Sequence, residues 1–220
     1  MDRPAIIEKS DADLRVRPNL SDYEGERARF RWQDAAAALA GLPGGGLNIA
    51  HEAVDRHAAG PLRDRTALRF VSRTGPALEI SYARLQRDTS RFANVLRALG
   101  VGRGDRVFVL AGRIPELYVA ILGALKNGSV VTPLFSAFGP EPIATRANIG
   151  KAKVLVTTDL LYRRKVAKVR AQIPTLEHVL LVAEEGGSTN EPGTVDLAAR
   201  MAEASDTFTV ASTGPEDAAL

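Results

Sequence analysis

From residue 66 onward, short apolar runs alternate with longer segments of helical periodicity, and this alternation restricts the fold more than any other feature. The apolar runs cover residues 106–110, 130–135, 154–157 and 178–182. Strands that are apolar without interruption are buried on both faces, as in parallel sheets covered by helices. The sequence therefore predicts an α/β fold, a largely parallel sheet flanked by helices. Two shorter strands, 67–72 and 77–80, are expected before it, joined by a turn at Gly75 and Pro76.

The intervening segments carry helix signals at their ends. Ser81 is a candidate N-cap for a helix that Gly100 ends, and Pro115 begins a second helix that Gly128 ends. The apolar stripe of the first helix comprises Leu85, Phe92, Val95, Leu96 and Leu99. Further helices are expected over 141–149, 160–171 and 195–204, followed by a strand near 207–210. Helices and strands thus continue to alternate almost to the end of the chain.

The first part of the chain differs in composition. Residues 1–64 are polar, then rich in alanine, then rich in glycine, and a helix over 47–59 restarts with Asn48 as a candidate N-cap. We expect two parts, an N-terminal extension over 1–64 and a sheet-containing domain over 65–220. The helix over 47–59 and the region of Trp32 are expected to be loosely held, as is the acidic end after Glu184.

Charge is distributed unevenly. Residues 151–172 hold seven lysines and arginines against one acid, Asp159, whereas residues 184–220 hold eight acids and one arginine. A focused basic patch attracts polyanions, either nucleic acid or a phosphorylated cofactor. A non-catalytic binding module that uses residues 151–172 is therefore one hypothesis. The low aromatic content, 5%, argues against binding of nucleic acid by base stacking.

Several classes of site are not expected. The chain has no cysteine, and its three histidines are scattered, so no metal site is predicted. Gly100, Gly102 and Gly104 follow a helix and precede a strand, the reverse of the order in a dinucleotide fingerprint. No apolar run is long enough to span a membrane. No signal peptide is visible, so a cytoplasmic protein is expected.

The most informative segment runs from 130 to 164. Phe135 lies at the end of one predicted strand, and Arg163 and Arg164 lie just beyond the next strand, across an intervening helix. Ligands of parallel sheets collect beyond the carboxyl ends of the strands, where an aromatic ring can stack on a base and a guanidinium can bind phosphate. The alternative is that Phe135 belongs to the core and the arginines to a solvated surface. Judged on these residues alone, the alternative is favoured.

Five stretches carry a resemblance to a known family. They read NIAHEAVDRH (48–57), SRFANVLRALGVGRGDRV (90–107), RIPELYVAILGALKNGSVV (113–131), LFSAFGPE (134–141) and AKVLVTTD (152–159). Together they resemble acetyl-CoA synthetases of the adenylate-forming superfamily, which also includes fatty acyl-CoA ligases and luciferases. The resemblance implies the first subdomain of the adenylate-forming N-terminal domain, preceded by a helical extension.

The resemblance also implies a reaction. Such enzymes convert ATP, acetate and coenzyme A into acetyl-CoA, AMP and pyrophosphate, with Mg²⁺ on ATP, and propionate or another short or medium acid is the alternative substrate. The lysine-containing loop that holds ATP phosphates in the family is not found, because Ser212, Thr213 and Gly214 lack the residues that follow in the motif. We therefore expect an N-terminal fragment without catalytic residues, inactive alone, whose partners are small substrates and the remainder of its own chain.

The part of the site that the resemblance places in this chain is one wall of the coenzyme A site. It implies that Phe135 stacks on the adenine, that Ser136 and Ala137 contact the ligand through their backbone, and that Arg163 approaches the 3′-phosphate. Ser136 and Ala137 stand where longer members often have two glycines. Arg164 is the nearest substitute for a second arginine of those members. With the resemblance, the binding role of Phe135 and Arg163 becomes at least as well supported as the structural alternative.

Overall fold

The computed structural model describes residues 10–16, 18–71, 75–184 and 186–220. The chain forms two compact units, Met1–Ala40 and Gly41–Leu220. Among the described residues of the first unit, the helical elements are η1 (Asp11–Asp13), α1 (Tyr23–Arg29) and α2 (Trp32–Ala37). The Asp22 side chain caps α1, since its Oδ1 accepts from the Gly25 N–H at 2.9 Å. Neither α1 nor α2 has a buried residue, and Trp32 is 78% exposed, as expected.

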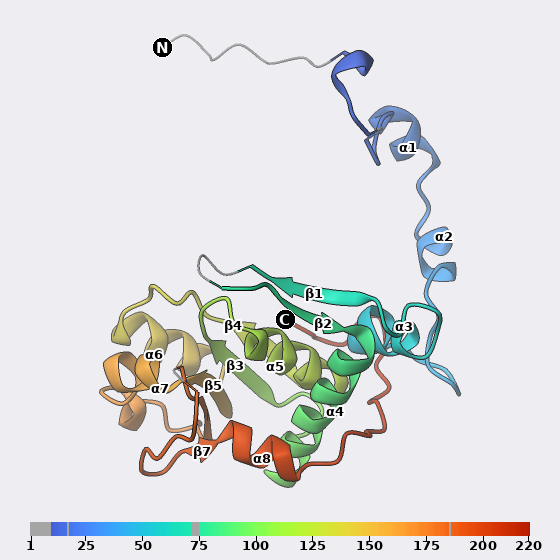
Figure 1. The fold of residues 1–220 in the computed structure, drawn as a ribbon. Helices are drawn as coiled ribbons and strands as arrows, with labels where there is room; N and C mark the ends of the chain where they lie inside the picture. Colours follow the sequence, from blue (N-terminus) through green and yellow to red (C-terminus); the bar gives the residue numbers. More distant parts are fainter. Residues whose placement is uncertain (1–9, 17, 72–74, 185) are drawn as a thin grey trace, which may run out of the picture. The chain divides into compact units, whose positions relative to one another are not determined.

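The second unit is built on a sheet of five parallel strands in the order β4-β3-β5-β6-β7 (Figure 1). Its strands are β3 (Arg106–Leu110), β4 (Val130–Pro133), β5 (Val154–Thr158), β6 (His178–Val182) and β7 (Val195–Asp196). A separate antiparallel pair consists of β1 (Thr66–Phe70) and β2 (Leu78–Ser81). The parallel sheet confirms the fold class predicted from the sequence.

Helical segments surround this sheet. They are η2 (His51–Asp55), α3 (Arg56–Ala58), α4 (Tyr82–Ala98), α5 (Pro115–Lys126), α6 (Pro140–Ile149), α7 (Asp159–Leu161), η3 (Tyr162–Val166), η4 (Arg170–Gln172) and α8 (Leu197–Glu203). The caps expected for the two longest helices are confirmed: the Ser81 hydroxyl accepts from the Arg84 N–H, and Pro115 is at the first helical position. Gly100 and Gly128 end these helices with φ of 71° and 78°, a region that favours glycine.

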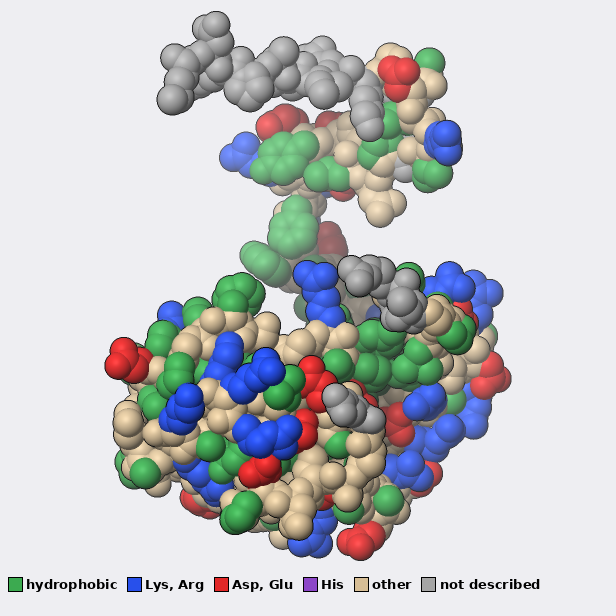
Figure 2. Space-filling model, turned by 60° about the vertical axis from the view of Figure 1, so that its left-hand side comes forward, with side chains coloured by type: hydrophobic (Ala, Val, Ile, Leu, Met, Phe, Trp, Pro, Cys, Tyr) green, Lys and Arg blue, Asp and Glu red, His purple; other side chains and the backbone are tan. Residues whose placement is uncertain are grey.

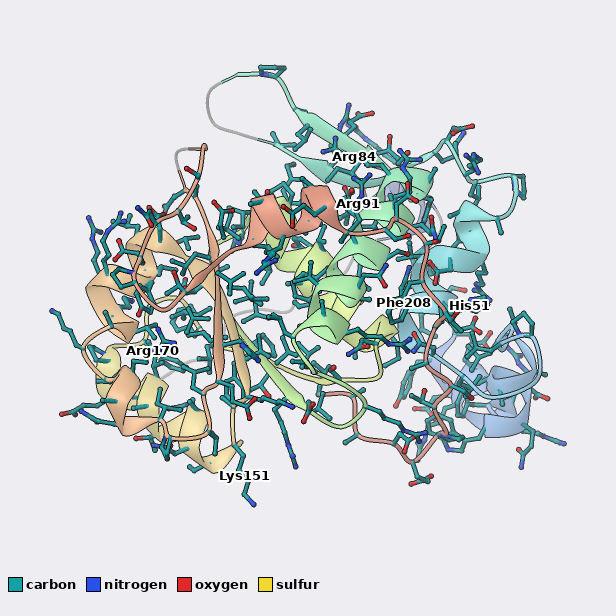
Figure 3. The ribbon with its side chains drawn as sticks, turned by 90° about the horizontal axis from the view of Figure 1, so that it is seen from below. His51, Arg84, Arg91, Lys151, Arg170 and Phe208 are labelled. Carbon is teal, nitrogen blue, oxygen red and sulfur yellow. The ribbon has the colours of Figure 1, made fainter. Side chains whose placement is uncertain are left out.

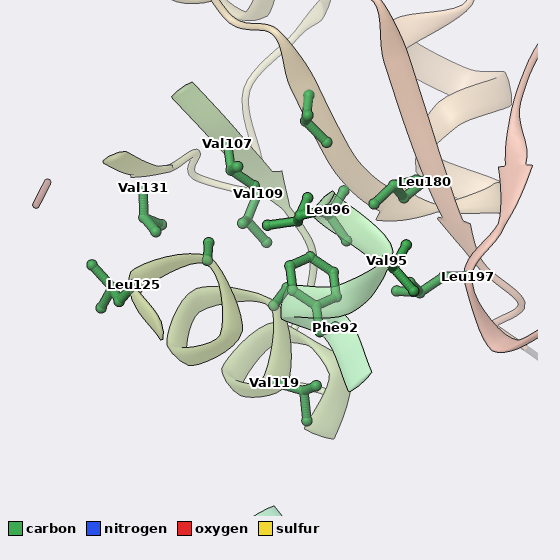
Figure 4. Packing of buried hydrophobic residues seen from close by; sticks show 14 of the residues in the cluster. Phe92, Val95, Leu96, Val107, Val109, Val119, Leu125, Val131, Leu180 and Leu197 are labelled. Atoms are coloured by element: carbon green, nitrogen blue, oxygen red, sulfur yellow. The ribbon is translucent and has the colours of Figure 1, made fainter. Parts of the chain in front are cut away.

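Successive residues of the central strands face opposite sides of the sheet and enter two separate cores. Val107 and Val109 point toward α4 and α5, where Phe92 lies at the centre of the packing (Figure 4). Phe108 and Leu110 point to the other side, onto α6 and the segment 162–176. Burial on both faces explains why these strands read as unbroken apolar runs.

The segment 49–58 is better held than expected. Ala50 and Val54 are fully buried in the core shared with α4 and α5, which contradicts the prediction that this helix is loosely packed. Asn48 is the predicted cap, since its Oδ1 accepts from the Ala50 N–H at 2.9 Å. Its Nδ2 also donates to the carbonyls of Leu125 and Ala211, which fixes the helix start to two distant segments.

The end of the chain departs from the sequence prediction in two places. Val195 and Asp196 form β7 beside β6, and Asp196 then caps α8 by accepting from the Ala199 N–H at 3.0 Å. Residues 207–210 form no strand. This segment lies along α4 instead, where Asn94 Nδ2 donates to the carbonyls of Ser205 and Thr207, so no strand is available to pair with it.

The acidic end is also tied down rather than frayed. Leu47 and Thr213 form an antiparallel bridge, and the Val131 N–H of β4 donates to the Ala219 carbonyl at 2.8 Å. Ser212 and Thr213, which match only part of the phosphate-loop motif, donate from their hydroxyls to the carbonyls of Gly45 and Leu47. These side chains therefore hold the two ends of the second unit together.

Candidate functional site

The candidate site lies beyond the carboxyl ends of β4, β3 and β5. The chain passes from β3 outward to β4 and then crosses back to β5 on the other side of β3. Ligands of open parallel sheets bind at such a reversal of strand order. The loop after β4 and the turn after β5 therefore flank the end of β3, and they carry all five residues predicted for the coenzyme A site.

The loop after β4 presents an aromatic ring to solvent. Phe135 is 65% exposed, which excludes the alternative that it belongs to the core. The loop is closed by a hydrogen bond from the Phe138 N–H to the Phe135 carbonyl at 3.0 Å. The two rings meet edge to face with centroids 5.7 Å apart, and Arg146 lies over the Phe138 ring. An edge-to-face contact uses at most one face of the Phe135 ring, so Phe138 leaves the other face available for stacking.

The turn after β5 carries the arginines. Residues 160–171 were expected to form one regular helix, but the structure has the short α7 followed by the π-helical turn η3, in which the Ala167 N–H donates to the Tyr162 carbonyl. Tyr162 and Val166 are buried and anchor this turn, whereas Arg163 and Arg164 are exposed. Such widened turns are rare and are frequent at functional sites.

Arg163 is held by two carboxylates. It pairs with Asp159 and with Glu191, each at 3.0 Å. The hydrogen bond to Glu191 is the largest influence and raises the pKa of Arg163 above its ordinary value. Burial acts to raise the pKa of Asp159, but the N–H groups of Glu184 and Leu160 and the Arg163 guanidinium outweigh it, so this pKa is lowered. Arg163 is thus oriented by two ion pairs and stays charged.

The two segments meet through a residue that the sequence did not single out. Lys165 Nζ donates to the Ser136 carbonyl at 2.6 Å. This contact joins the Phe135 loop to the turn that carries Arg163 and Arg164. Ala137 is exposed on the same loop. No motif marks Lys165 in the sequence, because its partner is a backbone atom on another loop.

The basic stretch 151–172 does not form one focused patch. Lys153 directly precedes β5 and pairs with Asp105 at 2.9 Å, whereas Arg163 follows β5. The two ends of β5 are roughly 16 Å apart at the usual rise per residue. Lys151 and Arg170 also lie well apart in Figure 3, and Arg170 donates to the Tyr162 hydroxyl. Seen from the side of α6 and α7, basic side chains are interspersed with acidic ones (Figure 2).

A second polar cluster, not predicted from the sequence, is buried between η2, α4 and α5. The side chain of Lys126 is fully buried and donates to Asp55 at 2.7 Å, to the Ser90 hydroxyl at 3.1 Å and to the Gln86 carbonyl at 3.3 Å. Burial lowers the pKa of Lys126, and Asp55 opposes this shift. Its one sequence signal is a lysine at the end of a helix that is mostly apolar after Glu116.

A cavity of about 500 Å³ lies beside this cluster. Its lining includes His51, Asp55, Gln86 and Phe208, and Figure 3 labels His51 and Phe208 on neighbouring segments. Within the described ranges, no group of three His, Asp or Glu side chains is arranged to hold a metal ion. Among the residues that the structure describes, no helix is both long enough and apolar enough to cross a bilayer.

Comparisons with known proteins agree with this architecture. Residues 54–220 match the family model of the AMP-binding enzymes. The chain is 37% identical over 185 residues to an acetyl-coenzyme A synthetase of Bacillus subtilis, covering 83% of this chain and 32% of that protein. It is also 37% identical over 155 residues to a 3-hydroxypropionyl-coenzyme A synthetase of Metallosphaera sedula, covering 70% of this chain and 23% of that protein.

Solved structures show the same relationship. An acyl-CoA synthetase of Brucella canis superposes with a TM-score of 0.78 at 34% identity, covering 89% of this chain and 34% of that chain. An anthranilate CoA ligase shares the fold, with a TM-score of 0.68 at 20% identity. The chain spans about a third or less of the length of the curated relatives that it matches.

Proposed function

The chain belongs to the AMP-binding enzyme family, and we propose that it is the N-terminal part of an acetate–CoA ligase. Such a ligase uses ATP and acetate to make an acetyl adenylate and pyrophosphate, and coenzyme A then displaces AMP. Several similar proteins are named acetyl-coenzyme A synthetases, at 32–37% identity to this chain. Because one relative is named a 3-hydroxypropionyl-coenzyme A synthetase, another short acid is the alternative substrate.

We assign to this chain one wall of the coenzyme A site, formed by Phe135, Ser136, Ala137, Arg163 and Arg164. The observation that carries the assignment is the exposed Phe135 ring, on a loop that the hydrogen bond from Lys165 to the Ser136 carbonyl joins to the turn of Arg163. An exposed ring can stack on a purine, and a guanidinium can bind a phosphate. Coenzyme A supplies the thiol that accepts the acetyl group, and these residues bind and orient its nucleotide end.

The remaining groups of the reaction are assigned to the part of the ligase beyond this chain. ATP, its Mg²⁺ and acetate need a phosphate loop and a carboxylate pocket, and no catalytic residue is assigned here. The boundary near residue 65 between an extension and the AMP-binding domain also stays a prediction. The separation of Lys153 from Arg163 speaks against a module that binds polyanions through one basic patch.

The assignment predicts that changes at this site in the full-length ligase impair the use of coenzyme A and spare the formation of the adenylate. Phe135→Ala should lose a stacking contact worth about 1–3 kcal/mol, and Arg163→Ala a charge-assisted contact worth about 1.5–3 kcal/mol. Each change should raise the KM for coenzyme A and leave acetate-dependent pyrophosphate exchange nearly unchanged. Phe30→Ala is the control and should leave both values unchanged, because this ring is similarly exposed but belongs to the first unit, outside the assigned site. Equal loss of both half-reactions would show that the two residues are structural.

A further inference from the structure

Lys165 connects two loops that follow different strands. Its ammonium group lies 2.6 Å from the Ser136 carbonyl oxygen in a partly buried position, across 29 residues of sequence. One loop follows β4 and the other follows β5, and both strands pair with β3. This hydrogen bond is therefore a tertiary contact across the carboxyl end of β3.

The Ser136 carbonyl lies in the middle of the turn that carries Phe135. The Leu134 N–H donates to the Val109 carbonyl of β3 at 2.8 Å and fixes the start of the turn. The Phe138 N–H donates to the Phe135 carbonyl and closes it. These two hydrogen bonds do not involve the peptide group after Ser136. The hydrogen bond from Lys165 to the Ser136 carbonyl holds that peptide group and is the third attachment of the turn. The direction of the Phe135 ring depends on this local backbone.

The other end of the contact is fixed to the core. Tyr162 and Val166 are buried on either side of Arg163 and Lys165, and the widened turn is closed by the bond from the Ala167 N–H to the Tyr162 carbonyl. Arg163 is oriented by Asp159 and Glu191, while Lys165 reaches the Phe135 loop. One turn therefore carries the guanidinium and is attached to the loop that carries the aromatic ring.

We propose that Lys165 is a positioning residue that holds the Phe135 ring at the correct place relative to Arg163 for binding the nucleotide of coenzyme A. The proposal rests on the coenzyme A assignment made above. Lys165 acts through the Ser136 carbonyl and makes no contact with the ligand. A bond from an ammonium to a carbonyl keeps the loop in its binding geometry before the ligand arrives, which reduces the ordering cost of binding.

The test uses the full-length ligase and compares three single variants. Lys165→Met keeps the length of the side chain and removes the donor, and it should raise the KM for coenzyme A about five- to twentyfold. Lys165→Arg keeps a charged donor, and it should stay within about threefold of the unchanged enzyme. Lys168→Met removes an exposed lysine from the same stretch and should leave this KM unchanged. Pyrophosphate exchange and the midpoint of thermal unfolding should be unaltered in all three.

A double variant separates positioning from direct contact. If Lys165 acts through Phe135, adding Lys165→Met to Phe135→Ala should change the KM for coenzyme A by no more than about twofold. Independent, multiplying effects would show that Lys165 contacts the ligand itself and would overturn the proposal. So would a lower unfolding midpoint with equal loss of both half-reactions, which indicates a structural role.

The outcome for Phe135→Ala alone identifies which of the two proposals fails. If Phe135→Ala raises the KM for coenzyme A and Lys165→Met does not, the positioning role is refuted and the coenzyme A assignment stands. If neither change affects coenzyme A, the site assignment is refuted, and the role of Lys165 with it.

Discussion

Lys126 and Asp55 form the most completely buried ion pair among the described residues, and they join three helical segments. Lys126 ends α5, Asp55 ends η2, and the ammonium also reaches Ser90 and Gln86 of α4. A buried charge is tolerated only when it is paired and hydrogen-bonded. Because the hydrogen bonds of this ammonium come from separate segments, the pair fixes how the helices lie against one another.

Removing one partner should therefore cost more than removing both. Lys126→Met leaves the Asp55 carboxylate without its counter-ion and should lower the free energy of unfolding by about 3 kcal/mol. The double change Lys126→Met with Asp55→Leu should recover most of this loss, since apolar residues of similar volume can replace a buried pair. Urea unfolding of each variant measures the effect.

The matched control for this experiment is an exposed pair. Arg69 and Glu79 lie 2.7 Å apart across β1 and β2 with both side chains largely in solvent. Arg69→Met should change stability by less than about 1 kcal/mol. A loss at Lys126 no greater than the loss at Arg69 would contradict the assigned role of the buried pair.

At the scale of elements, the contact of α4 with α5 depends on a glycine. A β-carbon at Gly123 would lie 2.8 Å from the Thr89 carbonyl oxygen and 2.8 Å from a ring carbon of Phe92. Phe92 is fully buried in the core that both helices cover (Figure 4). The helices can approach this closely only where the side chain of α5 is absent.

Gly123→Ala has two opposing effects on stability, a gain in helix propensity and a loss from overpacking. Alanine favours a helix interior over glycine by about 1 kcal/mol, but overpacking a core costs about 1–3 kcal/mol. Packing should prevail here, because the Thr89 carbonyl belongs to the backbone and cannot move aside as a side chain does. Thermal unfolding should show a lower midpoint for Gly123→Ala, and no loss for Gly102→Ala, where no atom lies within 4 Å of the added carbon. A midpoint at or above that of the unchanged protein would show that the helices separate easily.

The elements that could be predicted are those whose signal is local. The apolar runs of β3 and β6, the Ser81 cap and the two glycine stops are readable because they reflect burial or backbone conformation at the residue itself. The widened turn at Tyr162 and the short β7 could not be predicted, since both depend on partners from other parts of the chain. In the proposed site, Phe135 and Arg163 were predicted with the help of the family resemblance, whereas Lys165 was not, because its partner is a backbone atom of another loop.

At the scale of the whole chain, the division into two units has a measurable consequence. The described helices of the first unit bury no residue, and the second unit contains both cores. The N-terminal boundary of stable structure is therefore expected near Gly41 rather than near residue 65. Regions with few buried contacts open readily and are cleaved first.

Limited proteolysis with trypsin tests this boundary. Cleavage at Arg27, Arg29 and Arg31 should precede cleavage at Arg97 in α4, leaving a resistant product that begins between residues 28 and 32 and retains residues 47–58. Mass spectrometry identifies the product. Early cleavage at Arg56 or Arg63 would instead mean that the segment 49–58 is loosely held, in agreement with the sequence prediction and against the structure.

The bridge between Leu47 and Thr213 affects when the chain can complete its folding during synthesis on the ribosome. The two residues are separated by 166 positions, so the start of the segment 49–58 is attached to its distant partners only when the end of the second unit emerges. At a translation rate of 5–20 residues per second, the early segment waits about 8–30 s for its partner. In the first part of that interval, until α4 and α5 have emerged, the apolar side chains of Ala50 and Val54 lack their cover, and the nascent chain presents a target for chaperones that bind exposed apolar segments.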